Sequence, residues 1–233
     1  MPHLAAMINS SVGKKFLQAL TGLGLFAFVI VHLIGNLTLL LGPSAFNGYA
    51  YFLEELGHGM VVPLADCGLL LFFGVHIVTG IRVALLDKGK ARPQGYQVDG
   101  NAGGKSRKSF SSMSMIVTGI LLAIFLPIHL WNFKYAATTG YGPPEHQMRD
   151  LYLVVENLFS QPVWVVFYVV VMVALGFHLW HGVWSAFQSL GLTHPRWLPF
   201  LNLIGWGFAF LLAVGFIYLP VAMYFNYVPL TGG

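Results

Sequence analysis

Five long apolar stretches make up most of this 233-residue chain. An α-helix rises about 1.5 Å per residue, so about 20 residues cross a hydrocarbon core about 30 Å thick. With 57% hydrophobic and only 9% charged residues, the composition excludes an ordinary soluble domain. We therefore predict an all-α membrane protein, a single transmembrane domain over residues 1–233. Its five spans are Phe16–Leu41, Val62–Leu86, Met113–Trp131, Pro162–Phe187 and Leu198–Tyr224.

The basic residues set the orientation of these spans. Only two of the twelve, Lys134 and Arg149, fall on one side. Lys and Arg are enriched in cytoplasmic loops. We predict a multi-pass protein of the inner (cytoplasmic) membrane with its N-terminus in the cytoplasm and its C-terminus outside, and no nucleic-acid partner. The inner residues are Lys14, Lys15, Arg82, Lys88, Lys90, Arg92, Lys105, Arg107, Lys108 and Arg196.

The loops between the spans differ in character. On the outer side, Ser44–Leu56 and Gln147–Phe159 combine apolar and polar residues and are predicted to be short interfacial helices. On the inner side, Asp87–Phe110 is polar, basic and glycine-containing, which favours an exposed, irregular loop suited to a protein partner. We expect the inner basic face to bind soluble subunits.

Cysteine usage limits the cofactor chemistry. Cys67 is the only cysteine in the sequence, so no intrachain disulfide and no cysteine-based zinc or iron–sulfur site is expected within this chain. The sequence has no Cys-x-x-Cys-His motif, so any haem would be bound non-covalently. The first apolar stretch is too long for the core of a cleavable signal, and none is expected.

Four histidines lie inside four different spans, and they fall at two depths. Counted from the cytoplasmic ends, His32 and His129 are each roughly 16 residues in, whereas His76 and His178 are roughly 9 or 10 residues in. The pairs therefore differ in depth by roughly 9 Å. An ionisable residue inside a span is costly and indicates a function. We predict an outer pair, His32 with His129, and an inner pair, His76 with His178.

Each histidine alone could be a buried, hydrogen-bonded imidazole or a proton-relay group. Four of them at two matched depths favour two bis-histidine haems, held by a bundle of the first four spans with the fifth span packed outside. His181 lies one turn from His178 and could be the ligand instead, or bond a haem propionate or quinone. The remaining histidines, at ends or in loops, are expected to be solvated: His3, His58, His146 and His194.

Glycines close to these histidines are candidates for making room for a flat macrocycle, because glycine removes bulk where a group approaches a helix. Ordinary close contact between helices is the alternative for each of them. The glycines concerned are Gly35, Gly74, Gly80, Gly176 and Gly182.

Several motifs resemble one known family. They are residues 11–15 (SVGKK), 19–22 (ALTG) and 32–37 (HLIGNL) in the first span, His76 with residues 80–82 (GIR) in the second, and residues 178–191 (HLWHGVWSAFQSLG) in the fourth. The chain resembles the cytochrome b membrane-anchor subunit of succinate:quinone oxidoreductases and fumarate reductases (respiratory complex II) over most of residues 10–220. The type implied is the single-chain, five-helix, two-haem anchor.

The resemblance implies a role in respiratory electron transport and the tricarboxylic acid cycle. A flavoprotein subunit carrying FAD and an iron–sulfur subunit would sit on the cytoplasmic face, and this anchor would pass electrons between them and a membrane quinone, for which we expect menaquinone. The four span histidines would be axial ligands of two haems b. No catalytic residue for succinate itself is expected in this chain.

Positive side chains at the inner mouth suit haem propionates. Arg82, Lys14 and Lys15 are the candidates, although the positive-inside rule alone would also explain the lysines. Other cofactor-binding candidates beside them are Ser11, His181 and Trp184.

The acidic residues bear on where quinone reacts. No Asp or Glu lies between Pro162 and Arg196, which puts in doubt any proton path that needs a carboxylate beside the inner haem in the fourth span. We favour a quinone site at the outer haem, and the competing site is the inner mouth near His181 and Trp184. The titratable groups nearest the outer surface are Asp66, Glu54, Glu55 and His58.

Two other functions remain open from the sequence. One is the dihaem anchor of another quinone-linked dehydrogenase, which the fourth-span motif disfavours. The other is a transporter or proton channel that uses the histidines as a relay without haem. An optical spectrum of the reduced protein distinguishes the relay from a cytochrome, because only haem has a sharp b-type α band.

Overall fold

The structure is a computed structural model that describes residues 10–87, 110–192 and 194–227. Five of the described helices are long and apolar enough to cross a membrane, and each overlaps one predicted span. The prediction of an all-α membrane protein with five spans is therefore confirmed. The helices are α2 (Ser11–Asn36), α4 (Val61–Ile81), α6 (Phe110–His129), α8 (Pro162–Ser189) and α9 (Leu198–Tyr224).

Local sequence signals explain where several helices begin. The Ser10 side chain caps α2 by accepting a hydrogen bond from the Gly13 amide at 3.0 Å. Three helices, α3 (Pro43–Glu55), α8 and α9, have a proline in their first turn, where its missing N–H costs nothing. Between α2 and α3, Gly42 has φ 95°, a left-handed conformation that glycine adopts without strain and that lets the chain reverse.

Two spans end in π-helical turns. The segment η4 (Leu130–Lys134) follows α6 directly, and η2 (Arg82–Asp87) follows α4. Such turns occur frequently at functional sites. In η4 the turn begins at the residue after His129, and the guanidinium of Arg149 holds it by donating to the carbonyl oxygens of Phe133 (2.6 Å) and Ala136 (2.8 Å). The end of the third span is thus tied to the loop that carries Arg149.

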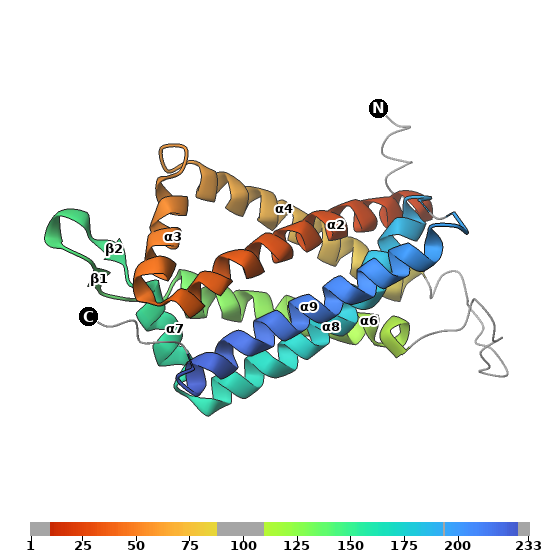
Figure 1. Ribbon diagram of the computed structural model, residues 1–233. Helices are drawn as coiled ribbons and strands as arrows, with labels where there is room; N and C mark the ends of the chain where they lie inside the picture. The colour runs from red at the N-terminus through yellow and green to blue at the C-terminus, as the bar shows by residue number, and fades with distance from the viewer. Residues whose placement is uncertain (1–9, 88–109, 193, 228–233) are drawn as a thin grey trace.

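One end of the molecule, called here the cap end, carries α3, α7 (Leu151–Phe159) and a small hairpin (Figure 1). The hairpin was not predicted: β1 (Gly140–Tyr141) pairs antiparallel with β2 (Met148–Arg149), so the second short helix begins at Leu151 rather than at Gln147. Between the strands lies a short 3-10 turn, η5 (Pro144–His146). In α7, Tyr152, Val154, Val155 and Phe159 are buried, whereas α3 exposes Tyr51 and Phe52.

The five long helices pack unequally. α8 and α9 make the closest pair, and α9 also touches α2, as expected for a fifth helix outside the other four. By contrast, α4 has one buried residue, Thr79, and touches α6 little. The two ribbons run apart over much of their length in Figure 1. The helices α2, α4, α6 and α8 therefore form a loosely closed group with α9 on one side.

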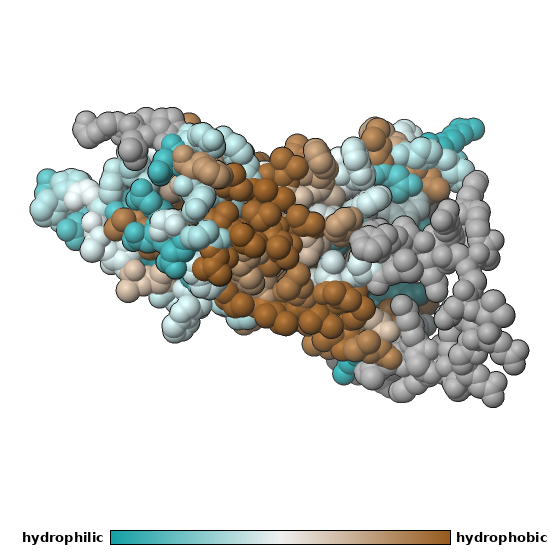
Figure 2. Space-filling view, turned by 90° about the horizontal axis from the view of Figure 1, so that it is seen from below, coloured by the Kyte–Doolittle hydropathy of each residue, from teal (hydrophilic) through white to brown (hydrophobic). Residues whose placement is uncertain are grey.

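The surface agrees with a membrane location. A hydrophobic band crosses the middle of the molecule between two more hydrophilic ends (Figure 2). The end opposite the cap, called here the basic end, holds the start of α2, the turn η2 after α4 and the turn before α9 (Figure 1). These segments carry Lys14, Lys15, Arg82 and Arg196. Most of the predicted inner loop, with Lys88, Lys90, Arg92, Lys105, Arg107 and Lys108, lies outside the described residues, as does His3.

A buried amide joins the two short helices of the cap end. Asn47 on α3 has no exposed surface. Its Nδ2 donates to Asp150 Oδ1 at 2.9 Å, and its Oδ1 accepts from the Tyr152 amide at 2.8 Å. The same Asp150 oxygen caps α7 by accepting from the Leu153 amide at 3.1 Å. These bonds hold α7 against α3 over the ends of the spans.

Replacing Asn47 with Ala should therefore destabilise the cap end. The change leaves a buried backbone N–H at Tyr152 without its acceptor, which costs about 1–3 kcal/mol. We expect a lower free energy of unfolding, measured as a lower thermal midpoint in detergent. Asn202→Ala, at an exposed position of α9, is the control. Equal midpoints for the two variants would contradict the importance of this contact.

Candidate functional site

The four span histidines meet in two facing pairs. His32 on α2 faces His129 at the end of α6, with ring centroids 5.8 Å apart. His76 on α4 faces His178 on α8, with ring centroids 6.3 Å apart. These are the two pairs expected from depth. Four helices thus supply one ring each. Each histidine lies in the second half of its helix, and α2 and α6 run toward the cap end whereas α4 and α8 run away from it, so the two pairs lie at different heights.

The pair nearer the cap end, His32 with His129, lies among aromatic rings. Phe28 stacks on the His32 ring at 5.3 Å and 20°, and Phe216 of α9 lies 5.9 Å from it. The His129 ring is flanked by Phe125 at 5.3 Å and Phe133 at 5.1 Å. Such walls exclude water and lower the local dielectric. Phe216 was not predicted to lie here, because the sequence indicated only that the fifth span packs outside the other four.

Hydrogen bonding at the cap-end pair is incomplete. Among the residues that the structure describes, the buried Nδ1 of His129 has no hydrogen-bond partner. The Asn36 amide lies 3.4 Å from both ring nitrogens of His32, but its shortest bond is to the His32 carbonyl oxygen at 2.8 Å. A buried polar atom without a partner is uncommon in a native protein and calls for a missing ligand, ion or water.

The pair nearer the basic end is more polar. Nδ1 of His76 lies 3.2 Å from the Gln18 carbonyl oxygen, and Nδ1 of His178 lies 3.2 Å from the Thr118 hydroxyl. The Gln18 amide nitrogen lies 3.4 Å from Nε2 of His76, a long contact. Its Oε1 accepts a bond from the Thr79 hydroxyl at 2.6 Å. Each ring is therefore held on its Nδ1 side.

This geometry fits a haem better than a metal ion held by protein alone. An imidazole nitrogen binds a transition metal at about 2 Å, so two rings that share one ion have centroids about 6 Å apart, as both pairs do. No three His, Cys, Asp or Glu side chains gather within the described ranges, as a protein-only site would require. Each facing pair of imidazoles would hold one haem iron, which would supply redox chemistry there.

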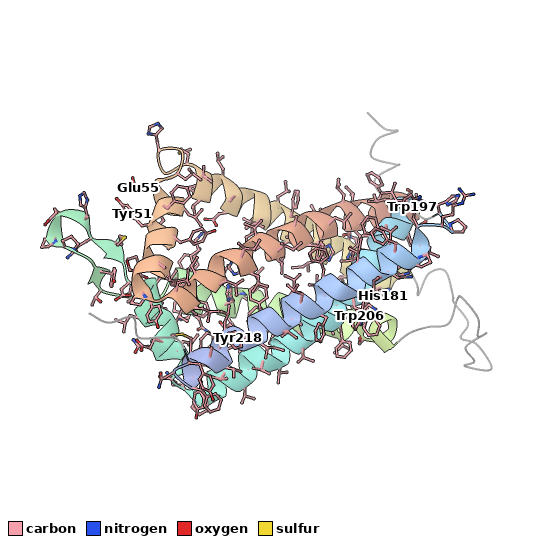
Figure 3. All side chains as sticks on the ribbon, in the orientation of Figure 1. Tyr51, Glu55, His181, Trp197, Trp206 and Tyr218 are labelled. Atoms are coloured by element: carbon pink, nitrogen blue, oxygen red, sulfur yellow. The ribbon has the colours of Figure 1, made fainter. Side chains whose placement is uncertain are left out.

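The other predicted cofactor residues lie at the basic end. Ser11 and Lys14 are in the first turn of α2, Arg82 begins η2, and His181 and Trp184 are in the last turns of α8. A cavity of about 400 Å³ opens beside them (Figure 3 labels His181). Of the residues that line this cavity, only Lys15 was predicted from the sequence. The lining residues are Lys15, Gln18, Val83, Ser185, Gln188 and Ser189.

A larger cavity of about 640 Å³ lies at the cap end, between η4 and its following loop on one side and α7 on the other. Asn132, on its wall, donates to the hydroxyl of the buried Tyr168 at 3.2 Å. The Tyr168 ring lies 6.2 Å from the ring of His129, so polar groups lead from this cavity to the histidine. The other polar residues that line the cavity are Thr138, Thr139, Asn157 and Gln161.

The acidic groups predicted near the outer surface do not line that cavity. Asp66 forms an ion pair with Lys134. Glu54 and Glu55 are exposed at the end of α3, with His58 in the turn that follows. In Figure 3, Glu55 lies on the side of α3 that faces away from the long helices.

The glycines chosen from the sequence do not face the histidine rings. Gly35 packs against the Tyr49 ring, Gly80 against the Gln18 side chain and Gly176 against Ala213, which is ordinary helix contact. No atom lies within 4 Å of a Cβ placed on Gly74 or Gly182. The glycines that do face histidine rings are Gly22, against His76, and Gly119, against His178. The rotation of each helix about its axis decides what a glycine contacts, and spacing from the histidine on the same helix does not.

Comparisons with known proteins agree with the motifs. Residues 15–99 match the family model described as succinate dehydrogenase/fumarate reductase transmembrane subunit. The chain is 28% identical to the succinate dehydrogenase cytochrome b558 subunit of Bacillus subtilis (strain 168) over 166 residues, which cover 71% of this chain and 73% of the relative. No solved structure matches significantly. The resemblance found in the sequence is confirmed.

The two facing pairs predict how single variants behave. We expect His76→Ala or His178→Ala to abolish one haem, and His32→Ala or His129→Ala to abolish the other, because each pair would share one iron. The spectrum of each purified variant, recorded across a redox titration, shows which component is lost. His146→Ala, at an exposed loop position, should retain both. Loss of the same component in His76→Ala and His129→Ala would show the pairing to be wrong.

Proposed function

From its similarity to succinate dehydrogenase/fumarate reductase transmembrane subunits, we propose that this chain is the dihaem cytochrome b anchor of such a complex. It passes electrons between an iron–sulfur subunit and membrane quinone, and it anchors that subunit and an FAD-carrying flavoprotein at the membrane. The observation that carries the dihaem proposal is the presence of two facing histidine pairs on four spanning helices, with ring centroids 5.8 and 6.3 Å apart.

Each histidine pair would hold one of the two haems b. His32 and His129 would ligate one, and His76 and His178 the other. When bound, each haem iron supplies one-electron redox chemistry. If both histidines of a pair bound the iron, they would leave no open position for oxygen. The protein contributes ligand orientation and an apolar wall, here Phe28, Phe125, Phe133 and Phe216 around one pair.

The basic end suits the soluble partners. Lys14, Lys15, Arg82 and Arg196 lie there, and the positive-inside rule places this end in the cytoplasm of a cell with the chain in its inner membrane. The cavity lined by Lys15, Gln18 and three other polar residues would receive carboxylates such as haem propionates, together with the predicted Ser11, Lys14, Arg82, His181 and Trp184.

The cap-end cavity suits a quinone headgroup, with menaquinone as the expected substrate. Its volume of about 640 Å³ is within the range of ligand pockets, about 300–1,000 Å³. Amide and hydroxyl groups on its wall can bond quinone oxygens, and Asn132 and Tyr168 connect it to His129. This arrangement supports reaction at the outer side, although Asp66 and Glu55 do not line the cavity.

The dihaem proposal predicts about two haems per polypeptide. A pyridine haemochrome assay on protein purified from its native membrane measures this ratio, and the same preparation shows which subunits co-purify. A value near one would discard one pair of ligands. A reduced spectrum with no b-type α band would instead favour a histidine relay.

Quinone binding at the cap end predicts selective kinetic changes. Replacing Asn157 with Leu or Thr139 with Val removes a polar group from the cavity, and one hydrogen bond contributes about 0.5–1.5 kcal/mol, or roughly 2–10-fold in affinity. We expect a KM for a menaquinone analogue raised by that factor, at unchanged haem content. Ser189→Ala, which alters the basic-end cavity, is the control. A KM raised only by Ser189→Ala would place the site at the opposite end.

A further inference from the structure

Two Thr-Gly dipeptides on different helices make the same contacts with the two histidines of the basic-end pair. Thr21-Gly22 of α2 touches His76, and Thr118-Gly119 of α6 touches His178. The threonine hydroxyl oxygens lie 3.4 and 3.2 Å from the respective Nδ1 atoms. A Cβ on Gly22 would meet Cε1 of His76 at 3.0 Å, and one on Gly119 would meet Cε1 of His178 at 3.4 Å.

The hydroxyl hydrogens determine the direction of these bonds. A threonine hydroxyl has one hydrogen to donate. Thr21 Oγ1 lies 2.6 Å from the Leu17 carbonyl oxygen, and Thr118 Oγ1 lies 3.0 Å from that of Ser114. A carbonyl oxygen cannot donate, so these approaches use the hydroxyl hydrogens. Each hydroxyl oxygen is then left to accept a bond from the ring.

The consequence is one tautomer for both rings. Nδ1 carries the proton and donates, and Nε2 retains the lone pair that binds a metal. The Gln18 carbonyl oxygen, 3.2 Å from Nδ1 of His76, accepts from the same atom and requires the same tautomer. A metal-bound histidine usually donates its other N–H to such an acceptor, which fixes the ring and raises its basicity.

We propose that Thr21-Gly22 and Thr118-Gly119 are matched positioning pairs, in which the threonine fixes the ring proton on Nδ1 and the glycine admits the ring edge, so that Nε2 of His76 and His178 is presented to one haem iron. The inference rests on the proposed dihaem function and adds positioning residues to it. The cap-end pair has no equivalent in the described part of the chain, since His129 Nδ1 has no partner.

The two threonines differ in one respect that can be measured. His76 keeps a second acceptor, the Gln18 carbonyl oxygen, when the Thr21 hydroxyl is removed. For Nδ1 of His178, Thr118 is the one acceptor within the described ranges. Loss of an acceptor lowers ligand basicity, which favours the reduced iron and raises its potential. The rise should therefore be larger in Thr118→Val than in Thr21→Val.

The test is a potentiometric titration of the purified complex, followed by absorbance and by electron paramagnetic resonance of the oxidised protein. In both valine variants we expect a higher potential and an altered resonance for the haem that His76→Ala or His178→Ala removes, and no change in the other haem. Thr21→Ser and Thr118→Ser, which keep the hydroxyl, should restore wild-type values. Loss of that haem in Thr118→Val with its retention in Thr118→Ser would also support the proposal.

Matched controls separate this role from general helix packing. Thr38→Val removes a hydroxyl that donates to the Gly35 carbonyl oxygen at 2.7 Å and should leave both haems unchanged. Gly22→Ala should shift the potential of the same haem more than Gly119→Ala, because its Cβ would lie closer to the ring, at 3.0 Å against 3.4 Å. Gly74→Ala should leave the potential unchanged, because its Cβ would meet no atom within 4 Å.

Two results would overturn the inference in distinguishable ways. Unmoved potential and resonance in both valine variants of a haem-loaded protein, or an equal shift in the serine variants, would overturn the positioning role alone. Wild-type protein that binds no haem would overturn the proposed function and this inference together.

Discussion

A ring nitrogen at the depth of the hydrocarbon core has no bulk water to bond, so an imidazole on a spanning helix needs a partner from the protein, a ligand or an enclosed water. This constraint explains much of the bundle's interior. His76 and His178 meet hydroxyl and carbonyl oxygens of neighbouring helices, whereas His129 retains a buried nitrogen without a partner among the described residues. The helices α2, α4, α6 and α8 are arranged so that these rings face one another rather than lipid.

The two histidine pairs lie in different surroundings. Aromatic rings surround the cap-end pair, and hydroxyl and amide groups surround the basic-end pair. Second-sphere hydrogen bonds and local polarity are the main means by which a protein sets the potential of a bound metal. If each pair held the proposed haem, the two haems would therefore differ in potential even with the same ligands.

Unequal packing makes space for this interior. α8 and α9 approach closely through small residues, with Gly176 against Ala213 and Gly205 against Val183. α4, in contrast, buries only Thr79. The helices are therefore packed closely on the α8–α9 side and loosely on the α4 side. The Asn47–Asp150 contact and the Arg149 guanidinium then fix the cap end above the rings.

The sequence by itself determined the spans, the two depths and the identity of the ring pairs, because helix rise is constant and hydrophobic length sets where a span can lie. It did not reveal the β1–β2 hairpin, the cap-end cavity or the residues that hold the rings. Thr21 and Thr118 look like ordinary span threonines that bond their own helix, and Gly22 and Gly119 lie on different helices from the histidines they face. Only the tertiary structure decided these contacts, because they depend on how each helix is rotated about its axis against its neighbours, which the spacing of residues along one helix does not specify.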